Sequence, residues 1–128
     1  MTVDDFVYVR LFSADDGTSR LEDIGTRLES RDFAPPAAPL WVTTLGDATG
    51  PLLLVAGPGG WRGDVPHPTP RRQFFCLLVG RFRITVSGGI TRDFAPGELL
   101  LLEDTWGEGH MTRFLTDRVV VMATALSD

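Results

Sequence analysis

Short apolar runs, each ended by glycine or proline, dominate this sequence and limit what it can fold into. The chain has 14 glycines and 9 prolines among 128 residues, spread along its whole length. Short apolar runs between such turn-forming residues are typical of β-strands. The runs expected to form strands span residues 6–12, 40–44, 52–56, 73–86 with a break at Gly80, 90–94, 99–102, 110–115 and 119–126. The sequence therefore predicts an all-β fold.

Alternation within these runs indicates which side chains face the core. In residues 81–86, arginine and threonine alternate with phenylalanine, isoleucine and valine, as in a strand with one solvated face. The Ser-Gly-Gly sequence at 87–89 predicts a hairpin turn, in which glycine supplies the positive φ. In residues 73–79, the side chains after Gln73 are apolar on both faces of the predicted strand, which indicates a strand covered on both faces.

One face of the strand at 73–79 needs a cover that the interior of a small barrel cannot provide. That face carries Phe74, Cys76 and Leu78, which would otherwise form an exposed apolar patch. The cover is expected to come from the N-terminal segment, from a two-fold partner, or from both. A homodimer is therefore predicted.

The length of the chain suits a single domain over residues 1–128. An N-terminal arm or outer strand pair is expected at residues 1–40, and a barrel at residues 41–128. Residues 18–29 are the only helix-like stretch, because leucine and isoleucine recur there at helical spacing. The same residues fit an irregular outer strand, which is favoured because Gly25 weakens a helix.

Charge and composition argue against several classes of function. The net charge of −5 gives no electrostatic basis for binding nucleic acid, and no run approaches the ~20 apolar residues of a membrane span. The acidic N-terminus is unlike a signal peptide, and the single cysteine, Cys76, cannot form an internal disulfide. The expectation is a cytoplasmic protein whose partner is a small-molecule ligand or substrate, with no nucleic acid or membrane partner.

The chain has two histidines, and each lies where a predicted strand meets a loop. The sequence around them resembles the motifs of the cupin family of small β-barrels. The first cupin motif consists of His-x-His followed by a glutamate and a glycine. In this chain His67 and Thr69 stand at the two histidine positions, Gln73 at the glutamate and Gly80 at the glycine. Pro-Gly-Glu at 96–98 and His110 match the second motif.

The match is best to a subgroup of single-domain bacterial cupins. Its members are similar in the run His-Pro-x-Pro-Arg-Arg-Gln and in the loop Glu-Asp-Thr-x-Gly-x-Gly-His. The resemblance covers residues 57–126. It implies a cupin double-stranded β-helix barrel of the jelly-roll type, here with an N-terminal arm.

The resemblance also implies a site for a divalent metal ion, with His67, Gln73 and His110 as ligands. Zinc, iron, manganese and nickel all accept such donors. Because Gln73 replaces a glutamate, this donor set is neutral and should bind a metal weakly. The residues themselves leave open whether a metal binds at all, since Gln73 could instead orient a histidine and both histidines could be structural.

Further residues are candidates for the pocket and for catalysis. Glu103 follows the apolar run at 99–102 and could act as a general base at the barrel mouth or simply belong to a turn. Arg71 shares a strand face with Gln73 by alternation and would favour a carboxylate or enolate ligand. The expected pocket residues are Trp61, Thr69, Arg71, Phe75 and Phe82.

The favoured function is a metal-assisted enzyme. The ion would act as a Lewis acid on a small carbonyl or enol substrate in an apolar pocket, for cyclisation, isomerisation or dioxygenation. The alternative is a metal-free barrel that binds an apolar small molecule without catalysis. A dimeric structural or regulatory protein with no ligand is the third possibility.

Overall fold

Strands make up nearly all the regular structure in the computed structural model, which describes residues 2–3, 6–58 and 60–128. In these residues the only helical element is a 3-10 turn at Ser87–Gly89, and no helix is long and apolar enough to cross a membrane. The predicted all-β class is confirmed. The strands are β1 (Thr2–Val3), β2 (Val7–Ser13), β3 (Ser19–Gly25), β4 (Leu28–Arg31), β5 (Leu40–Val42), β6 (Ala48–Gly57), β7 (Gly63–His67), β8 (Gln73–Val79), β9 (Phe82–Thr85), β10 (Thr91–Phe94), β11 (Leu99–Glu103), β12 (His110–Phe114) and β13 (Val119–Leu126).

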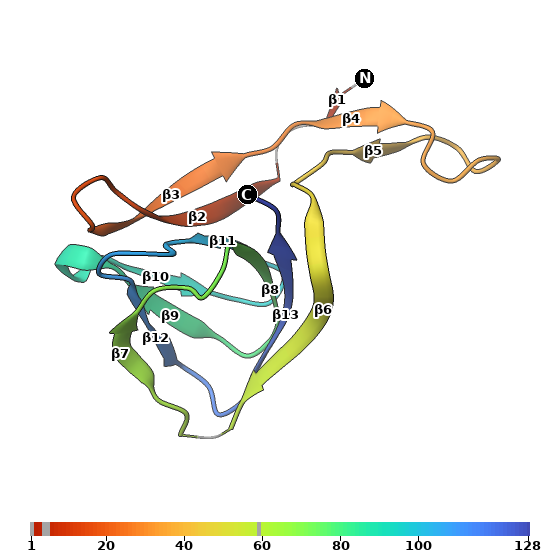
Figure 1. Ribbon diagram of the computed structural model, residues 1–128. Coiled ribbons are helices and arrows are strands. Elements are labelled where there is room, and N and C mark those ends of the chain that lie inside the picture. The colour runs from red at the N-terminus through yellow and green to blue at the C-terminus, as the bar shows by residue number, and fades with distance from the viewer. Residues whose placement is uncertain (1, 4–5, 59) are drawn as a thin grey trace.

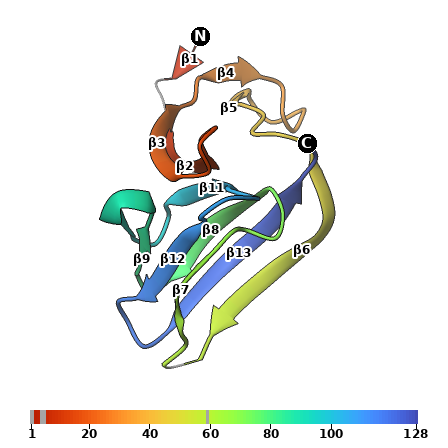
Figure 2. The ribbon, with the colours of Figure 1, turned by 60° about the vertical axis from the view of Figure 1, so that its left-hand side comes forward.

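Strands β6 to β13 form two facing sheets (Figures 1 and 2). In the larger sheet the order is β6, β13, β8, β11, and in the smaller sheet it is β7, β12, β9, β10. The chain passes from one sheet to the other at each step except β9 to β10. This is the strand order of a jelly roll, also called a double-stranded β-helix, as expected for this chain.

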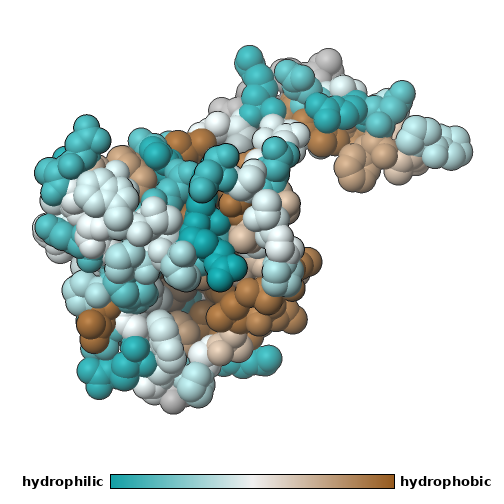
Figure 3. Space-filling model, in the orientation of Figure 1, coloured by the Kyte–Doolittle hydropathy of each residue, from teal (hydrophilic) through white to brown (hydrophobic). Residues whose placement is uncertain are grey.

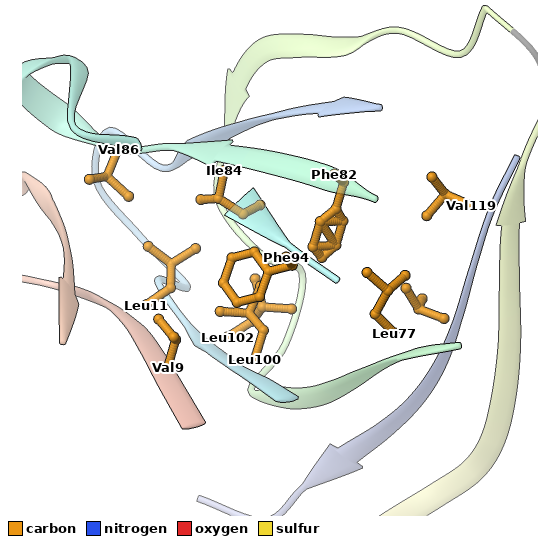
Figure 4. Packing of buried hydrophobic residues seen from close by; sticks show 11 residues of the cluster. Val9, Leu11, Leu77, Phe82, Ile84, Val86, Phe94, Leu100, Leu102 and Val119 are labelled. Carbon is orange, nitrogen blue, oxygen red and sulfur yellow. The ribbon is translucent and has the colours of Figure 1, made fainter. Parts of the chain in front are cut away.

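The core lies between the two sheets (Figure 4). Phe82 and Ile84 of β9 point inward and are buried, whereas Arg83 between them points outward and pairs with Asp93 at 2.7 Å. The alternation predicted for this strand is therefore confirmed. The buried cluster consists of Val9, Leu11, Leu77, Phe82, Ile84, Val86, Phe94, Leu100, Leu102, Val119 and Val121.

The turn predicted at the Ser-Gly-Gly sequence joins β9 to β10, which pair in antiparallel fashion. Gly88 and Gly89 have φ angles of 80° and 77°, so both require the conformational freedom of glycine. Strand β7 was not predicted, because it contains Pro66. It lies at the edge of the smaller sheet, where a missing backbone N–H is tolerated.

The N-terminal segment contributes a hairpin to the larger sheet. β2 and β3 pair with each other, and β2 pairs in parallel with β11. The strand interpretation of residues 18–29 is thus confirmed. Tyr8 of this hairpin packs edge-on against Phe74, with ring centroids 5.2 Å apart, so Phe74 is covered from within the chain. Leu78, on the same outer face of β8, remains 42% exposed.

A separate three-stranded sheet projects from the barrel (Figures 1 and 3). It is built from β1, β4 and β5, which pair in antiparallel fashion. We call this sheet, with the loop that joins β4 to β5, the arm. It continues directly into β6, the edge strand of the larger sheet on the side away from β2 and β3.

An ion-pair network fixes the N-terminal hairpin to the barrel. The carboxylate of Glu103, at the end of β11, accepts hydrogen bonds from Arg10 of β2 and from Arg72. Arg10 also pairs with Glu22 of β3 at 2.8 Å. Burial raises the pKa of Glu103, but the hydrogen bonds and charges of Arg72 and Arg10 outweigh it and hold the pKa below its usual range.

Replacing Glu103 with glutamine should therefore destabilise the protein at neutral pH. Because the pKa of Glu103 is lower in the folded protein than in the unfolded chain, the ionised carboxylate stabilises the fold. This stabilisation is complete at pH values above the pKa in the unfolded chain, about 4.3, and is lost as the pH falls through the pKa in the folded protein. We expect E103Q to cost about 1–3 kcal/mol at pH 7 and much less at low pH. Urea unfolding at both pH values measures the difference, and an equal cost at both would contradict the assignment.

Candidate functional site

A cavity of about 230 Å³ lies in the barrel interior and is lined by residues of both sheets. Its walls are mainly apolar, and its polar groups come from β7, β8, β12 and the loop before β8. The apolar walls include Phe75, Phe82, Ile84, Leu102, Val119 and Val121. The polar side chains are His67, Thr69, Gln73, His110 and Thr112.

The two histidines are neighbours across the paired strands β7 and β12. His67 and His110 are register partners, and their ring centroids lie 4.7 Å apart at an angle of 52°. The close approach depends on Gly109, whose φ is +72° and where a Cβ atom would overlap the backbone of His67. The jelly-roll topology thus brings together two side chains that are 43 residues apart in sequence.

Hydrogen bonds fix the protonation pattern of both imidazole rings. The Nδ1 atom of His67 lies 2.7 Å from the backbone oxygen of Val65, and Nδ1 of His110 lies 2.6 Å from a carboxylate oxygen of Asp104. Both partners can only accept, so each Nδ1 must donate. In the neutral ring this leaves a lone pair on Nε2, the arrangement found in histidines that bind metals through Nε2.

Gln73 lines the same cavity, and hydrogen bonds fix the orientation of its amide. Its Nε2 donates to the hydroxyl of Thr69 at 3.0 Å, and that hydroxyl donates to the backbone oxygen of Arg71 at 2.8 Å. This chain fixes which end of the amide carries the donors, so the Oε1 of Gln73 is the end left for a ligand. Thr69, buried at 3% exposure, thus lines the pocket and positions Gln73.

Asp104 is the site residue that sequence reasoning missed. Its place just after the apolar run at 99–102 is typical of a residue in a turn, but its side chain is fully buried and holds His110. Its backbone oxygen accepts from the N–H of Thr69 at 3.0 Å, which ties the two loops of the site together. Its Oδ1 has no hydrogen-bond partner among the described residues. The one signal in the sequence was an acidic residue six positions before a histidine.

The expected aromatic residues do line the cavity. Phe75 and Phe82 contribute to its walls, and Trp61 lies at its rim, 39% exposed. Trp61 stacks on Phe114, with ring centroids 4.9 Å apart and an interplanar angle of 28°. Phe114 was not among the expected pocket residues, although it also lines the cavity.

Arg71 and Glu103 are not brought to the cavity. Arg71 is exposed and lies before β8 begins, so the alternation of that strand does not orient it. Glu103 lies on the outer face of the larger sheet, because Leu100 and Leu102 of the same strand point inward. Its carboxylate is engaged by two guanidinium groups there.

The cavity holds atom types that bind divalent metal ions, although none of them carries a negative charge. They comprise two imidazole nitrogens with free lone pairs and one amide oxygen. No group of three or more His, Cys, Asp or Glu residues suited to a metal occurs in the described part of the chain. Among the other polar side chains of the cavity, Gln73 offers an amide oxygen and is the candidate for a third protein ligand.

Comparisons with known proteins found one similar structure to report and no related sequence. No protein-family model matches the chain, and no curated protein matches it. Among solved structures, the chain is similar to the cupin domain of Schizosaccharomyces pombe Cnp3, with a TM-score of 0.49 and 14% sequence identity. The alignment covers 98% of this chain and 86% of that chain. The jelly-roll assignment rests on the strand order above, and the functional argument rests on the cavity.

Proposed function

We propose that this protein is a cupin-type barrel that acts as a metal-assisted enzyme on a small, mainly apolar compound with a carbonyl or enol oxygen. The observation that carries the proposal is the pair of imidazoles in the cavity. Each is held through Nδ1, and the two rings are close enough for one small group to contact both.

The lone pairs of the cavity define what a ligand must offer. Two Nε2 atoms and the Oε1 of Gln73 are all acceptors, so the group between them must bring positive charge or hydrogen-bond donors. A divalent ion held by His67, His110 and Gln73 meets this requirement and, when bound, would polarise a carbonyl or enol oxygen as a Lewis acid. Asp104 would hold the ring and tautomer of His110, as carboxylates commonly do for metal-binding histidines.

The apolar walls determine the rest of the substrate. Phe75, Phe82 and Leu102 surround the space beside the polar groups, so the remainder of the substrate should be apolar and compact. Exclusion of water by these walls strengthens the interaction of the polar groups with charge on the substrate. Cyclisation, isomerisation and dioxygenation remain the proposed reaction types.

Metal titration of untagged protein tests this proposal. Zn²⁺, Mn²⁺, Ni²⁺ and Fe²⁺ are added separately and binding is measured by calorimetry. We expect one weakly bound ion in the wild type, loss of binding in H67A and H110A, and binding at least ~10-fold tighter in Q73E, because an anionic ligand replaces a neutral one. T91E, which adds the same charge on an exposed strand, is the matched control and should bind as the wild type does. Absence of binding in both the wild type and Q73E would refute the metal-assisted function.

A metal-free binding protein is the second candidate. It is favoured by the neutral amide at the third ligand position and by the apolar character of the walls. Phenol is a suitable probe, because its hydroxyl can donate to an Nε2 and its ring suits the walls. Binding of phenol with EDTA present, followed by nuclear magnetic resonance shifts of the two histidines, would support this candidate. Binding only after metal is added would favour the enzyme.

A further inference from the structure

The loop that leads into His110 contains two glycines, and its shape depends on contacts from outside it. We call residues 104–109 the site loop, because it carries Asp104 and ends at the residue before His110. Gly107 and Gly109 have φ angles of 83° and 72°. Glycine has the greatest conformational freedom of all residues, so the sequence of the loop alone does not fix its backbone. The position of His110 therefore depends on what holds the site loop.

The tip of the N-terminal hairpin holds the site loop. The backbone N–H of Glu108 donates to the backbone oxygen of Gly17 at 2.8 Å. A Cβ atom on Gly107 would overlap that same oxygen, so the two segments are packed without space between them. Ser13 and Ser19, which are register partners of β2 and β3, both donate hydroxyl protons to backbone oxygens at 106–109. The end of the hairpin and the site loop thus form one packed unit.

Ser19 makes the contact that lies next to His110. Its hydroxyl donates to the backbone oxygen of Gly109 at 2.6 Å, and this oxygen belongs to the peptide group that joins Gly109 to His110. Ser19 is 2% exposed, so the bond is shielded from water. Ser13 donates instead to the backbone oxygen of Trp106 at 2.7 Å, farther back in the loop. Ser19, and not Ser13, therefore holds the peptide group next to the histidine.

A second serine fixes the direction of the Ser19 hydroxyl. The Oγ of Ser19 accepts from the backbone N–H of Ser87 at 3.0 Å, and the Oγ of Ser87 accepts from the backbone N–H of Ser19 at 2.8 Å. The Ser87 hydroxyl donates to a carboxylate oxygen of Glu108 at 2.7 Å. Both hydroxyl protons are thus committed to the site loop. The pair connects this loop with the turn between β2 and β3 and with the 3-10 turn below it in Figure 1.

The peptide that Ser19 holds is also in close contact with the end of β7. A Cβ atom on Gly109 would overlap the backbone of His67 and Pro68. A shift of this peptide would therefore change the spacing of the two imidazole rings, whose centroids lie 4.7 Å apart. Groups that bind one ion together must be held within about 0.5 Å of the productive geometry.

We propose that Ser19 is a positioning residue of the histidine site. Its hydroxyl holds the Gly109 peptide, and through this peptide it sets the position of the His110 ring in the cavity wall. The N-terminal hairpin is then part of the site, although no described residue of the hairpin lines the cavity. For metal binding this inference rests on the proposed function, whereas for the position of the ring it rests on the hydrogen bonds alone.

The variants S19T and S19V separate the hydroxyl from the volume of the side chain. The two side chains have nearly the same shape, but only S19T keeps a hydroxyl that can donate to Gly109. We expect the affinity for Zn²⁺, measured by calorimetry, to fall by about 10–100-fold in S19V and to stay close to the wild-type value in S19T. S13A removes a hydroxyl bond to the same loop and is the matched control, which should leave the affinity unchanged.

A measurement without metal tests the position of the ring directly. The Nδ1 proton of His110 is bonded to Asp104 and buried, so we expect it to exchange slowly with water. Nuclear magnetic resonance should show exchange at least ~10-fold faster in S19V than in S19T, because a loosened Gly109 peptide lets the ring open to water more often. Circular dichroism checks folding. S19A, which adds no bulk, replaces S19V in both comparisons if S19V does not fold.

Three outcomes would overturn the assignment of Ser19. They are equal Zn²⁺ affinities in S19T and S19V, equal exchange rates in these two variants, and a loss of affinity in S13A as large as that in S19V. The last would show that any loosening of the site loop has the same effect. If the wild type binds no metal, the proposed function fails, and the exchange rates alone decide whether Ser19 positions His110.

Discussion

Replacing Leu11 with alanine is expected to lower the free energy of unfolding by about 3–5 kcal/mol. Leu11 is 0% exposed and lies on β2, in the N-terminal hairpin. In Figure 4 it is near Val86 and Val9, inside the cluster that joins the two sheets. Truncation leaves a cavity that neighbouring strands, fixed by their hydrogen bonds, can fill only in part.

The size of this effect distinguishes two descriptions of the N-terminal segment. If the hairpin of β2 and β3 only packed against a barrel that is stable without it, L11A would detach the hairpin with a small loss of stability. The urea midpoint of the barrel would then be unchanged. If the hairpin is part of the core, urea unfolding should remain one transition with a lower midpoint. V7A, at a position that is 55% exposed on the same strand, is the control and should change stability by less than ~0.5 kcal/mol.

The faces of single strands could be predicted where polar residues mark the alternation. Residues 82–85 are an example, because Arg83 identifies the solvated face and thereby the inner one. The strand at 99–102 has leucine at every position, so alternation could not say which face was inner. Alternation therefore could not decide whether Glu103 lay at the barrel mouth or only in a turn, and in the structure it lies on the outer face of the sheet.

The histidines could be placed because the resemblance supplies a topology. The sequence alone does not say that His67 and His110 meet, since that depends on β7 and β12 being neighbours in the smaller sheet. Arg71 was misplaced for a simpler reason: alternation holds only within a strand, and β8 begins at Gln73. The burial of Asp104 could not be predicted, because an Asp-Thr pair after a strand is equally typical of an exposed turn.

Removal of the Asp104 side chain is expected to have the largest effect on the site. Asp104 is fully buried, and among the described residues its only side-chain hydrogen-bond partner is Nδ1 of His110, which is itself 5% exposed. D104A leaves that N–H without an acceptor and opens a cavity beside it, which should cost about 3–5 kcal/mol. It should also end any binding at His110, because nothing would then fix the ring or its tautomer.

The asparagine variant separates positioning from stability. In D104N the amide oxygen can still accept from Nδ1 of His110, so the protein should remain folded by circular dichroism, while metal affinity falls by about 10–100-fold because the negative charge behind the imidazole is lost. D93N removes a carboxylate from a solvent-exposed ion pair with Arg83 and is the control that should leave metal affinity unchanged. If D104N binds metal as tightly as the wild type, Asp104 has only a structural role. A reduced affinity with intact folding would show that it acts through His110.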